Sequence, residues 1–365
     1  MQPQALKPLT ALRFFAAMWV VLFDYWPKLA GVAGTPGVIA KGYLGVEVFF
    51  ILSGFILCHV YLPHVEEGRY RHGPFLWARV ARIYPMHLAT LIAIAAMAVA
   101  AAIAGMAVDP DVVGWQALLA NLSLTHAWGL APSSAWNHSS WSISAEWFAY
   151  LCFPAFAWLA VKMRDRPWLA VAGALAVGAA LYVAFQALAG FPLTQATFRW
   201  GGLRIVPCFL YGCALYLLWR SGAVHGRILG SLGALISGAG LLIGAQLSLP
   251  DAALAAIGGV LIFSLAVLSN EDIGKKTPRA LVYLGEISYS IYMVVVPWDL
   301  LFVNGASMAL HLPDKRLPLG LWLIFACAVI PLAAGAYHLI EKPARERVRD
   351  WGVGRPKRDW KSTPA

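Results

Sequence analysis

Ten apolar runs constrain this chain more than any other feature of its sequence. Each is about 20 residues long, which is the length that an α-helix needs to cross the hydrocarbon core of a bilayer. Hydrophobic residues make up 60% of the 365-residue chain and charged residues only 13%, against about 25% charged residues in soluble domains. We therefore predict an all-α integral membrane protein with about ten transmembrane helices. The predicted spans are 10–28, 42–62, 85–107, 141–161, 168–190, 202–219, 227–248, 252–269, 281–303 and 318–340.

Lysine and arginine residues predict the orientation of these spans, because they are enriched in cytoplasmic loops. With the N-terminus in the cytoplasm, most of the 28 lysines and arginines fall in cytoplasmic segments. The outer segments then hold only Lys28, Lys41, Arg199, Lys315 and Arg316. We predict that both termini are cytoplasmic. The net charge of +10 therefore reflects membrane topology, and we expect no nucleic-acid partner.

We predict one membrane domain over residues 1–345 and a basic cytoplasmic tail over residues 346–365. The tail indicates attraction to anionic membrane lipids, with docking of a partner as the alternative. The five cysteines lie in apolar runs without a CxxC pair, and the nine histidines lack an HExxH or HxxxH spacing. We therefore expect no metal cofactor.

Charged residues within the spans are the candidates for function, because each costs about 2.5–3.5 kcal/mol at mid-span. The first span carries Arg13 and, eleven residues later, Asp24. Eleven residues of helix rise about 16.5 Å and leave the two side chains about 20° apart around the axis. One face of this helix is thus predicted to line a path across the membrane. The alternatives are an Arg13 that reaches the cytoplasmic interface and an Asp24 at the outer interface.

Four further charges fall at the depth of Asp24 in the predicted topology. Glu47, Glu146, Arg204 and Asp299 are expected to form one polar layer with Asp24 toward the outer face. Clustered carboxylates favour protonation of one of them, which suits acid–base chemistry on a hydroxyl. The alternative for Glu47 and Glu146 is a structural ion pair with Arg204, and Asp299 is interpreted as an ordinary surface charge.

Arg79 and Arg82 stand three residues apart at the predicted cytoplasmic side, in FLWARVARIYP. A helix would place both on one face, where paired arginines bind phosphates. From this fragment alone, ordinary positive-inside charge is the preferred explanation.

The chain resembles the membrane acyltransferase 3 family, whose ten-span members O-acylate surface glycans and other sugars. Five stretches in order carry the resemblance: ALRFFAAMWVVLFDYW, GYLGVEVFFILSGFIL, RVARIYP, WSISAEWFAYLCFP and YLGEISYSIYMVVVPW. The resemblance implies an acyl-CoA donor, usually acetyl-CoA, on the cytoplasmic side and a glycan hydroxyl as acceptor. It implies a location in the bacterial inner membrane, and it leaves the oligomeric state open.

The family motifs map onto individual residues of this chain. The resemblance implies that Arg13, Arg79 and Arg82 bind acyl-CoA. It places the first-span catalytic position at residue 24 and the conserved glutamate at Glu146. We take Asp24, Glu146 and Glu47 as candidate catalytic residues.

Two positions depart from the family pattern. Residue 24 is Asp where the family has its catalytic histidine, and residue 295 is Val where the pattern reads Y-L-x-H-x-P. A carboxylate of ordinary pKa is a much weaker base than imidazole. Either the carboxylates substitute for the histidine, or the chain is a weakly active or silent homologue. A transporter or flippase is the alternative from another class, because intramembrane charges also suit a transport path; it predicts a broken helix in each of two matching halves.

Overall fold

The structure is a computed structural model that describes residues 5–110 and 112–352 of the chain. In this part of the chain no β-strand forms, apart from a single isolated bridge between Leu29 and Leu317. Nine of its helices are long and apolar enough to cross a membrane, and a bent pair of shorter helices gives a tenth span. The predicted all-α membrane fold is confirmed.

The bundle consists of the spanning helices and short connecting helices. The spans are α1 (Lys7–Tyr25), α3 (Gly45–Glu66), α4 (His72–Ile103), the pair α6 (Trp141–Leu151) and α7 (Phe153–Met163), α8 (Pro167–Ala189), α9 (Gly201–Arg220), α10 (Arg227–Gln246), α11 (Asp251–Ser269), α14 (Ser288–Leu310) and α15 (Leu319–Ala336). The connecting elements are η1 (Trp26–Lys28), α2 (Gly37–Ala40), η2 (Gly42–Leu44), η3 (Trp115–Ala117), α5 (Leu118–Leu122), η4 (His138–Ser140), η5 (Leu193–Gln195), α12 (Asp272–Lys275), α13 (Arg279–Glu286), η6 (Pro313–Lys315), the π-helical turn η7 (Tyr337–Glu341) and α16 (Lys342–Gly352).

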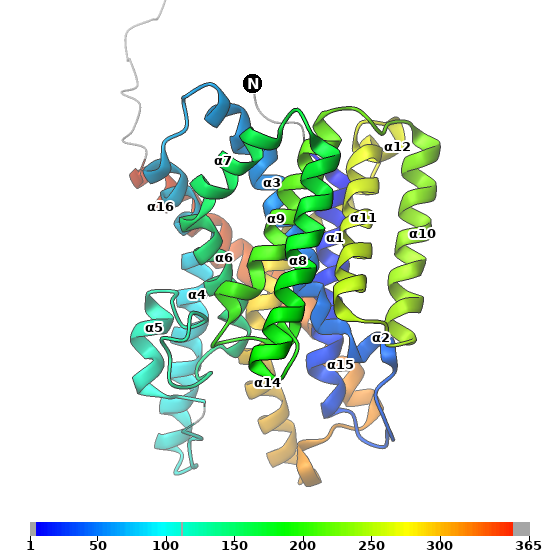
Figure 1. The fold of residues 1–365 in the computed structure, drawn as a ribbon. Coiled ribbons are helices and arrows are strands. Elements are labelled where there is room, and N and C mark those ends of the chain that lie inside the picture. Colours follow the sequence, from blue (N-terminus) through cyan, green and yellow to red (C-terminus); the bar gives the residue numbers. More distant parts are fainter. Residues whose placement is uncertain (1–4, 111, 353–365) are drawn as a thin grey trace, which may run out of the picture.

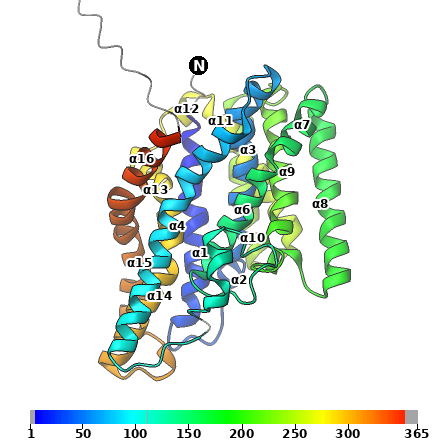
Figure 2. The same cartoon turned by 90° about the vertical axis from the view of Figure 1, so that its left-hand side faces the viewer.

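The most buried helices are α9 and α3, which pack on each other at the centre of the bundle. Glycines permit their close approach, as is usual for helices packed in membranes. A Cβ atom added to Gly54 would overlap the carbonyl oxygen of Phe209, and one added to Gly212 would overlap that of Ile51. In Figure 1, α10 and α11 lie on one side of the bundle and α4 and α5 on the opposite side. Figure 2 shows α8 at the edge opposite α15 and α16.

Both ends of the described chain lie at the same end of the bundle, as the N label and α16 show in Figure 1. This is the arrangement that an even number of crossings produces. Which side of a membrane this end faces remains a prediction. The predicted tail also remains a prediction: its start at residue 346 lies within α16, and residues 353–365 lie outside the described residues.

Two predicted span boundaries are wrong. Helix α4 begins at His72 and not near residue 85, so RVARIYP is part of a continuous 32-residue helix. The helix is longer than the roughly 20 residues that a bilayer requires, and its charged first third falls outside any search for apolar runs. The ninth span begins at Ser288 and not at residue 281, because the chain breaks at Ile287 between α13 and α14.

The fourth span is not one straight helix. Helices α6 and α7 meet at Cys152 with a bend of 59°. Pro154 stands in the first turn of α7, where a proline is accepted because its missing N–H would have no partner in that turn. A continuous helix would instead set the ring against the carbonyl of Tyr150. The bend therefore has a local cause, and it tilts α6 within the bundle.

Candidate active site

Three arginines line one cavity of about 200 Å³, which we call the inner cavity. Arg13 comes from α1, whereas Arg79 and Arg82 come from α4. Glu146 of α6 is the one carboxylate among the lining residues, and its Oε1 accepts a hydrogen bond from the hydroxyl of Ser53. The remaining lining is mainly apolar and aromatic. The inner cavity therefore carries a net positive charge.

Within the part of the chain that the structure describes, the arginines of the inner cavity form no ion pair with a carboxylate. Among the described residues, no ion pair joins Arg13, Arg79 or Arg82 to an acidic side chain. Arg79 instead donates to the Tyr61 hydroxyl at 3.3 Å. Its guanidinium lies 5.7 Å from the ring centroid of Tyr61 and 5.9 Å from that of Tyr150. Like charges repel strongly where water is excluded, so this cluster suits a polyanionic ligand.

A second cavity of about 400 Å³, the outer cavity, adjoins the first. Asp24 of α1, His138 of η4 and Arg204 of α9 line it, and Val46 and Tyr292 line both cavities. Arg13 and Asp24 therefore lie along one face of α1, one in each cavity. The helix face predicted from their spacing faces a pair of adjoining cavities.

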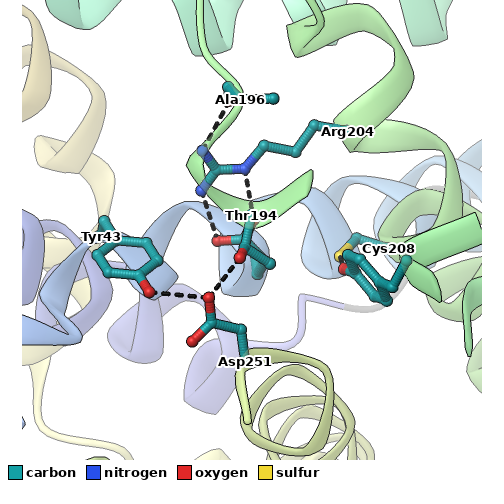
Figure 3. Close-up of polar contacts among 8 residues, drawn as sticks. Tyr43, Thr194, Ala196, Arg204, Cys208 and Asp251 are labelled. Atoms are coloured by element: carbon teal, nitrogen blue, oxygen red, sulfur yellow. Dashed lines mark hydrogen bonds and ion pairs between the residues drawn. The ribbon is translucent and has the colours of Figure 1, made fainter. Parts of the chain in front are cut away.

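Arg204, labelled in Figure 3, lines the outer cavity and forms an ion pair with Glu47. Arg204 Nε donates to Glu47 Oε1 at 2.6 Å, and Nη2 donates to Oε2 at 2.9 Å. Nη1 donates to the carbonyl oxygen of Ala196 at 2.8 Å, and the guanidinium lies 4.6 Å from the ring centroid of Trp141. Glu47 is fully buried and Arg204 is 1% exposed. Both carboxylate oxygens of Glu47 are thus engaged, away from either cavity.

Asp251, at the start of α11, ties the same wall together (Figure 3). It accepts hydrogen bonds from the hydroxyls of Tyr43, at 2.8 Å, and Thr194, and it pairs with Lys41 at 2.6 Å. Tyr43 and Thr194 also line the outer cavity. The polar contacts therefore hold η2, η5 and α11 in fixed positions around it.

A family model described as "Acyltransferase domain" matches residues 7–339 of the chain. The chain belongs to the acyltransferase 3 family. It is 30% identical over 316 residues to Acyltransferase MdmB of Streptomyces mycarofaciens, covering 79% of this chain and 78% of that protein. It is 25% identical over 195 residues to Peptidoglycan O-acetyltransferase OatA of Listeria monocytogenes, covering 49% of this chain and 30% of that protein. No solved structure matches the chain.

The two departures from the family pattern lie in different surroundings in this acyltransferase. Asp24 lines the outer cavity. Val295 is 2% exposed and packs in a hydrophobic cluster that also holds Tyr25, whose hydroxyl donates to the Val295 carbonyl oxygen at 3.0 Å. Val295 lines neither cavity. Only the change at residue 24 therefore alters a side chain that faces one of the two cavities.

The polar layer predicted from the sequence does not form as one layer. Asp24 and Arg204 line the outer cavity, but Glu146 lines the inner cavity with the arginines. Asp299 lines neither cavity and pairs with Lys28 at 3.2 Å. The tilt of α6 at its break with α7 accounts for the position of Glu146. For Glu47, the alternative of a structural pair with Arg204 describes its contacts.

Sequence reasoning missed His138, Tyr292 and Asp251 as residues of the site. His138 lies three residues before the WSISAEW stretch that carries Glu146. That proximity was the available signal. The described residues contain no group of three or more His, Cys, Asp or Glu side chains that would hold a metal ion. They contain one bent pair of helices, whereas the transporter alternative predicts a broken helix in each of two matching halves.

Proposed function

We propose that this acyltransferase moves an acyl group, most simply acetyl, from acyl-CoA to a hydroxyl of a glycan or related sugar. The observation that carries the proposal is the inner cavity, in which three arginines without carboxylate partners meet the glutamate of the family motif. CoA is a polyanion, and arginines bind its phosphates through charge-assisted hydrogen bonds. Family membership and the names of both relatives support acyl transfer.

The inner cavity is too small to enclose the whole acyl-CoA donor. A cavity of about 200 Å³ is smaller than the 300–1,000 Å³ of sites that enclose a whole drug-sized ligand. We propose that it takes the acyl thioester and part of the pantetheine arm. The arginines hold phosphates at its basic end, and Glu146, held by Ser53, faces the thioester end. The nucleotide stays outside, at the end of the bundle where α16 and the start of α1 lie (Figure 1), which we propose is cytoplasmic.

The outer cavity is the proposed acceptor site. Its lining includes hydrogen-bonding side chains at Asp24, Tyr43, Thr194, Gln195 and Thr197. Sugar hydroxyls are both donors and acceptors, and such a lining can bind several at once. The acceptor hydroxyl meets the thioester where the cavities adjoin, at Val46 and Tyr292. Asp24 binds the acceptor, and the Glu47–Arg204 pair supports the wall. This arrangement suits a multi-pass protein of the bacterial inner membrane.

Acetyl-CoA binding tests the donor site directly. We expect Arg82→Gln to weaken binding about 10- to 150-fold, because a hydrogen bond to a charged group contributes about 1.5–3 kcal/mol. Arg164→Gln is the matched control, since Arg164 is 52% exposed and pairs with its neighbour Asp165. Isothermal titration of the purified protein measures both. Equal affinity of Arg82→Gln and the unaltered chain would refute the donor site.

Transfer is measured with labelled acetyl-CoA on one side of a proteoliposome and an envelope polysaccharide fraction on the other. Label in the polysaccharide, with equal release of CoA thiol, supports the proposal. Movement of the polysaccharide without acetyl-CoA would instead support the transporter alternative. Acetyl-CoA binding without any transfer would indicate a silent homologue.

A further inference from the structure

We propose that His138 is the catalytic base of this chain, taking the proton from the acceptor hydroxyl in place of the histidine absent from position 24. The inference rests on the proposed function and assigns the proton transfer within the same site. The outer cavity has Asp24 on α1 where the family pattern has a histidine, and it has another histidine, His138, on η4.

The imidazole of His138 is available within the outer cavity. His138 is an exposed residue that lines the cavity together with Asp24, and its ring makes none of the hydrogen bonds found among the described side chains. By contrast, His87 and His126 are buried behind η4 and stack on each other with ring centroids 5.9 Å apart. Both are engaged, His87 with the Asn121 carbonyl at 2.9 Å and His126 with the Ser140 hydroxyl at 3.0 Å. His138 is thus the histidine of this region that a substrate can reach.

Asn137 and Ser140, on either side of His138 in the N-H-S-S stretch, anchor the backbone of η4. Asn137 is 1% exposed, and its amide donates to Thr90 Oγ1 and to the Met293 carbonyl, each at 3.0 Å. Ser140 is fully buried and donates to the Asn137 carbonyl at 2.7 Å. Because residues on either side point inward and are fixed, His138 is held toward the cavity. A base needs this kind of positioning to reach its proton.

Desolvation by burial lowers the pKa of His138, which keeps its imidazole neutral at pH 7 and able to accept a proton. Asp24 lines the same cavity. The opposing charge, Arg204, is neutralised by its pair with Glu47. The other titratable groups that face this region are Tyr43 and Tyr292 in the cavity and His126 behind η4. Burial, with a smaller effect of His87, lowers the pKa of His126 to about 3, so His126 is neutral at pH 7.

The proposed step balances without a further reactant. The acceptor oxygen forms a bond to the acyl carbon while His138 takes the hydroxyl proton, and the carbon–sulfur bond breaks. The thiolate leaves and is protonated to CoA thiol, while His138 gives its proton back to solvent.

Four chains test this role: the unaltered chain, His138→Gln, Asp24→His, and the double variant His138→Gln/Asp24→His. We expect His138→Gln to lower the transfer rate about 10²- to 10⁴-fold, the usual range for removal of a general base. Acetyl-CoA affinity should not change. The double variant should recover activity, because it restores an imidazole to the cavity. His225→Gln, at an exposed histidine outside the cavity, is the matched control.

The pH dependence separates a base from a structural residue. The unaltered chain should lose activity as the pH falls through the titration of the His138 imidazole, and burial places that pKa below the 6.5 of a free side chain. That limb should be absent in His138→Gln and return in the double variant. A purely structural role for His138 predicts no rescue by Asp24→His.

Two results would overturn the inference while leaving the proposed function in place. One is an unchanged rate in His138→Gln. The other is an inactive unaltered chain that Asp24→His activates, since His138 would then be insufficient as a base. If no chain transfers acetyl groups and none binds acetyl-CoA, the proposed function itself fails.

Discussion

The Glu47–Arg204 pair allows a structural role to be separated from a catalytic one. We predict that Glu47→Gln destabilises the protein by about 3–5 kcal/mol, the usual cost of leaving one partner of a buried ion pair uncompensated. Glu47 is fully buried, and Arg204 would lose its hydrogen bonds to carboxylate oxygens at 2.6 and 2.9 Å. The guanidinium of Arg204 would keep its contacts with the Ala196 carbonyl and the Trp141 ring. We therefore expect a loss of stability toward the lower end of this range. Total stabilities are about 5–15 kcal/mol, so the loss should be large.

Cysteine accessibility provides the assay. Cys58, Cys208 and Cys213 are buried and react with a thiol-specific dye only when the bundle opens. Cys327 is exposed and Cys152 is partly exposed, so both would be replaced by Ser in every chain to remove background. The apparent melting temperature in detergent is then read from dye fluorescence.

The double variant Glu47→Gln/Arg204→Gln supplies the decisive comparison. Removing both charges leaves no buried ion, so we expect it to be more stable than either single variant. Normal melting of Glu47→Gln, combined with loss of acetyl transfer, would refute the structural role and favour the catalytic role predicted from the sequence.

Three further predictions concern packing, pH and surface charge. Gly54→Ala should lower the melting temperature and yield, because its Cβ would overlap a carbonyl of α9, whereas Gly173→Ala meets nothing within 4 Å and should have little effect. Stability should decline as the pH falls from about 6.5 toward 3. In this range His126 takes up a proton in the unfolded chain but not in the fold, where its pKa is about 3. His126→Gln should flatten that decline in melting curves. Asp299→Asn should change stability by at most about 1 kcal/mol in the same assay, since its pair with Lys28 is partly exposed; a larger loss would mean that the pair is structural.

Hydropathy predicted the positions of most spans, because a helix needs about 20 apolar residues wherever it crosses a membrane. It failed where a spanning helix extends beyond the apolar core. The start of α4 carries Arg79 and Arg82, so a search for apolar runs excludes the very turns that face the inner cavity. The common face of Arg13 and Asp24 followed from helix periodicity alone, since α1 has no break between them.

The pairing of charges was harder to predict than their presence. Glu47, Glu146, Arg204 and Asp299 were assigned similar depths from span boundaries, and depth does not say which side chains meet. The break at Cys152 moves Glu146 toward the arginines of α1 and α4. Asp251 stands at the end of a span, where a carboxylate needs no special explanation, yet it contacts residues from two other elements. Contacts of this kind depend on helix tilt and loop paths, which local patterns do not encode.

The arrangement of the two cavities also explains why a change at residue 24 need not abolish the chemistry. Val46 and Tyr292 line both cavities. In the proposed function the donor and the acceptor meet there, so the base must stand on the acceptor side of that contact. It need not stand on α1. A cavity lined by α1, η2, η4, η5, α9 and α14 offers several positions from which an imidazole reaches one hydroxyl. A base on η4, as proposed, would keep an imidazole in the same cavity while changing the element that supplies it.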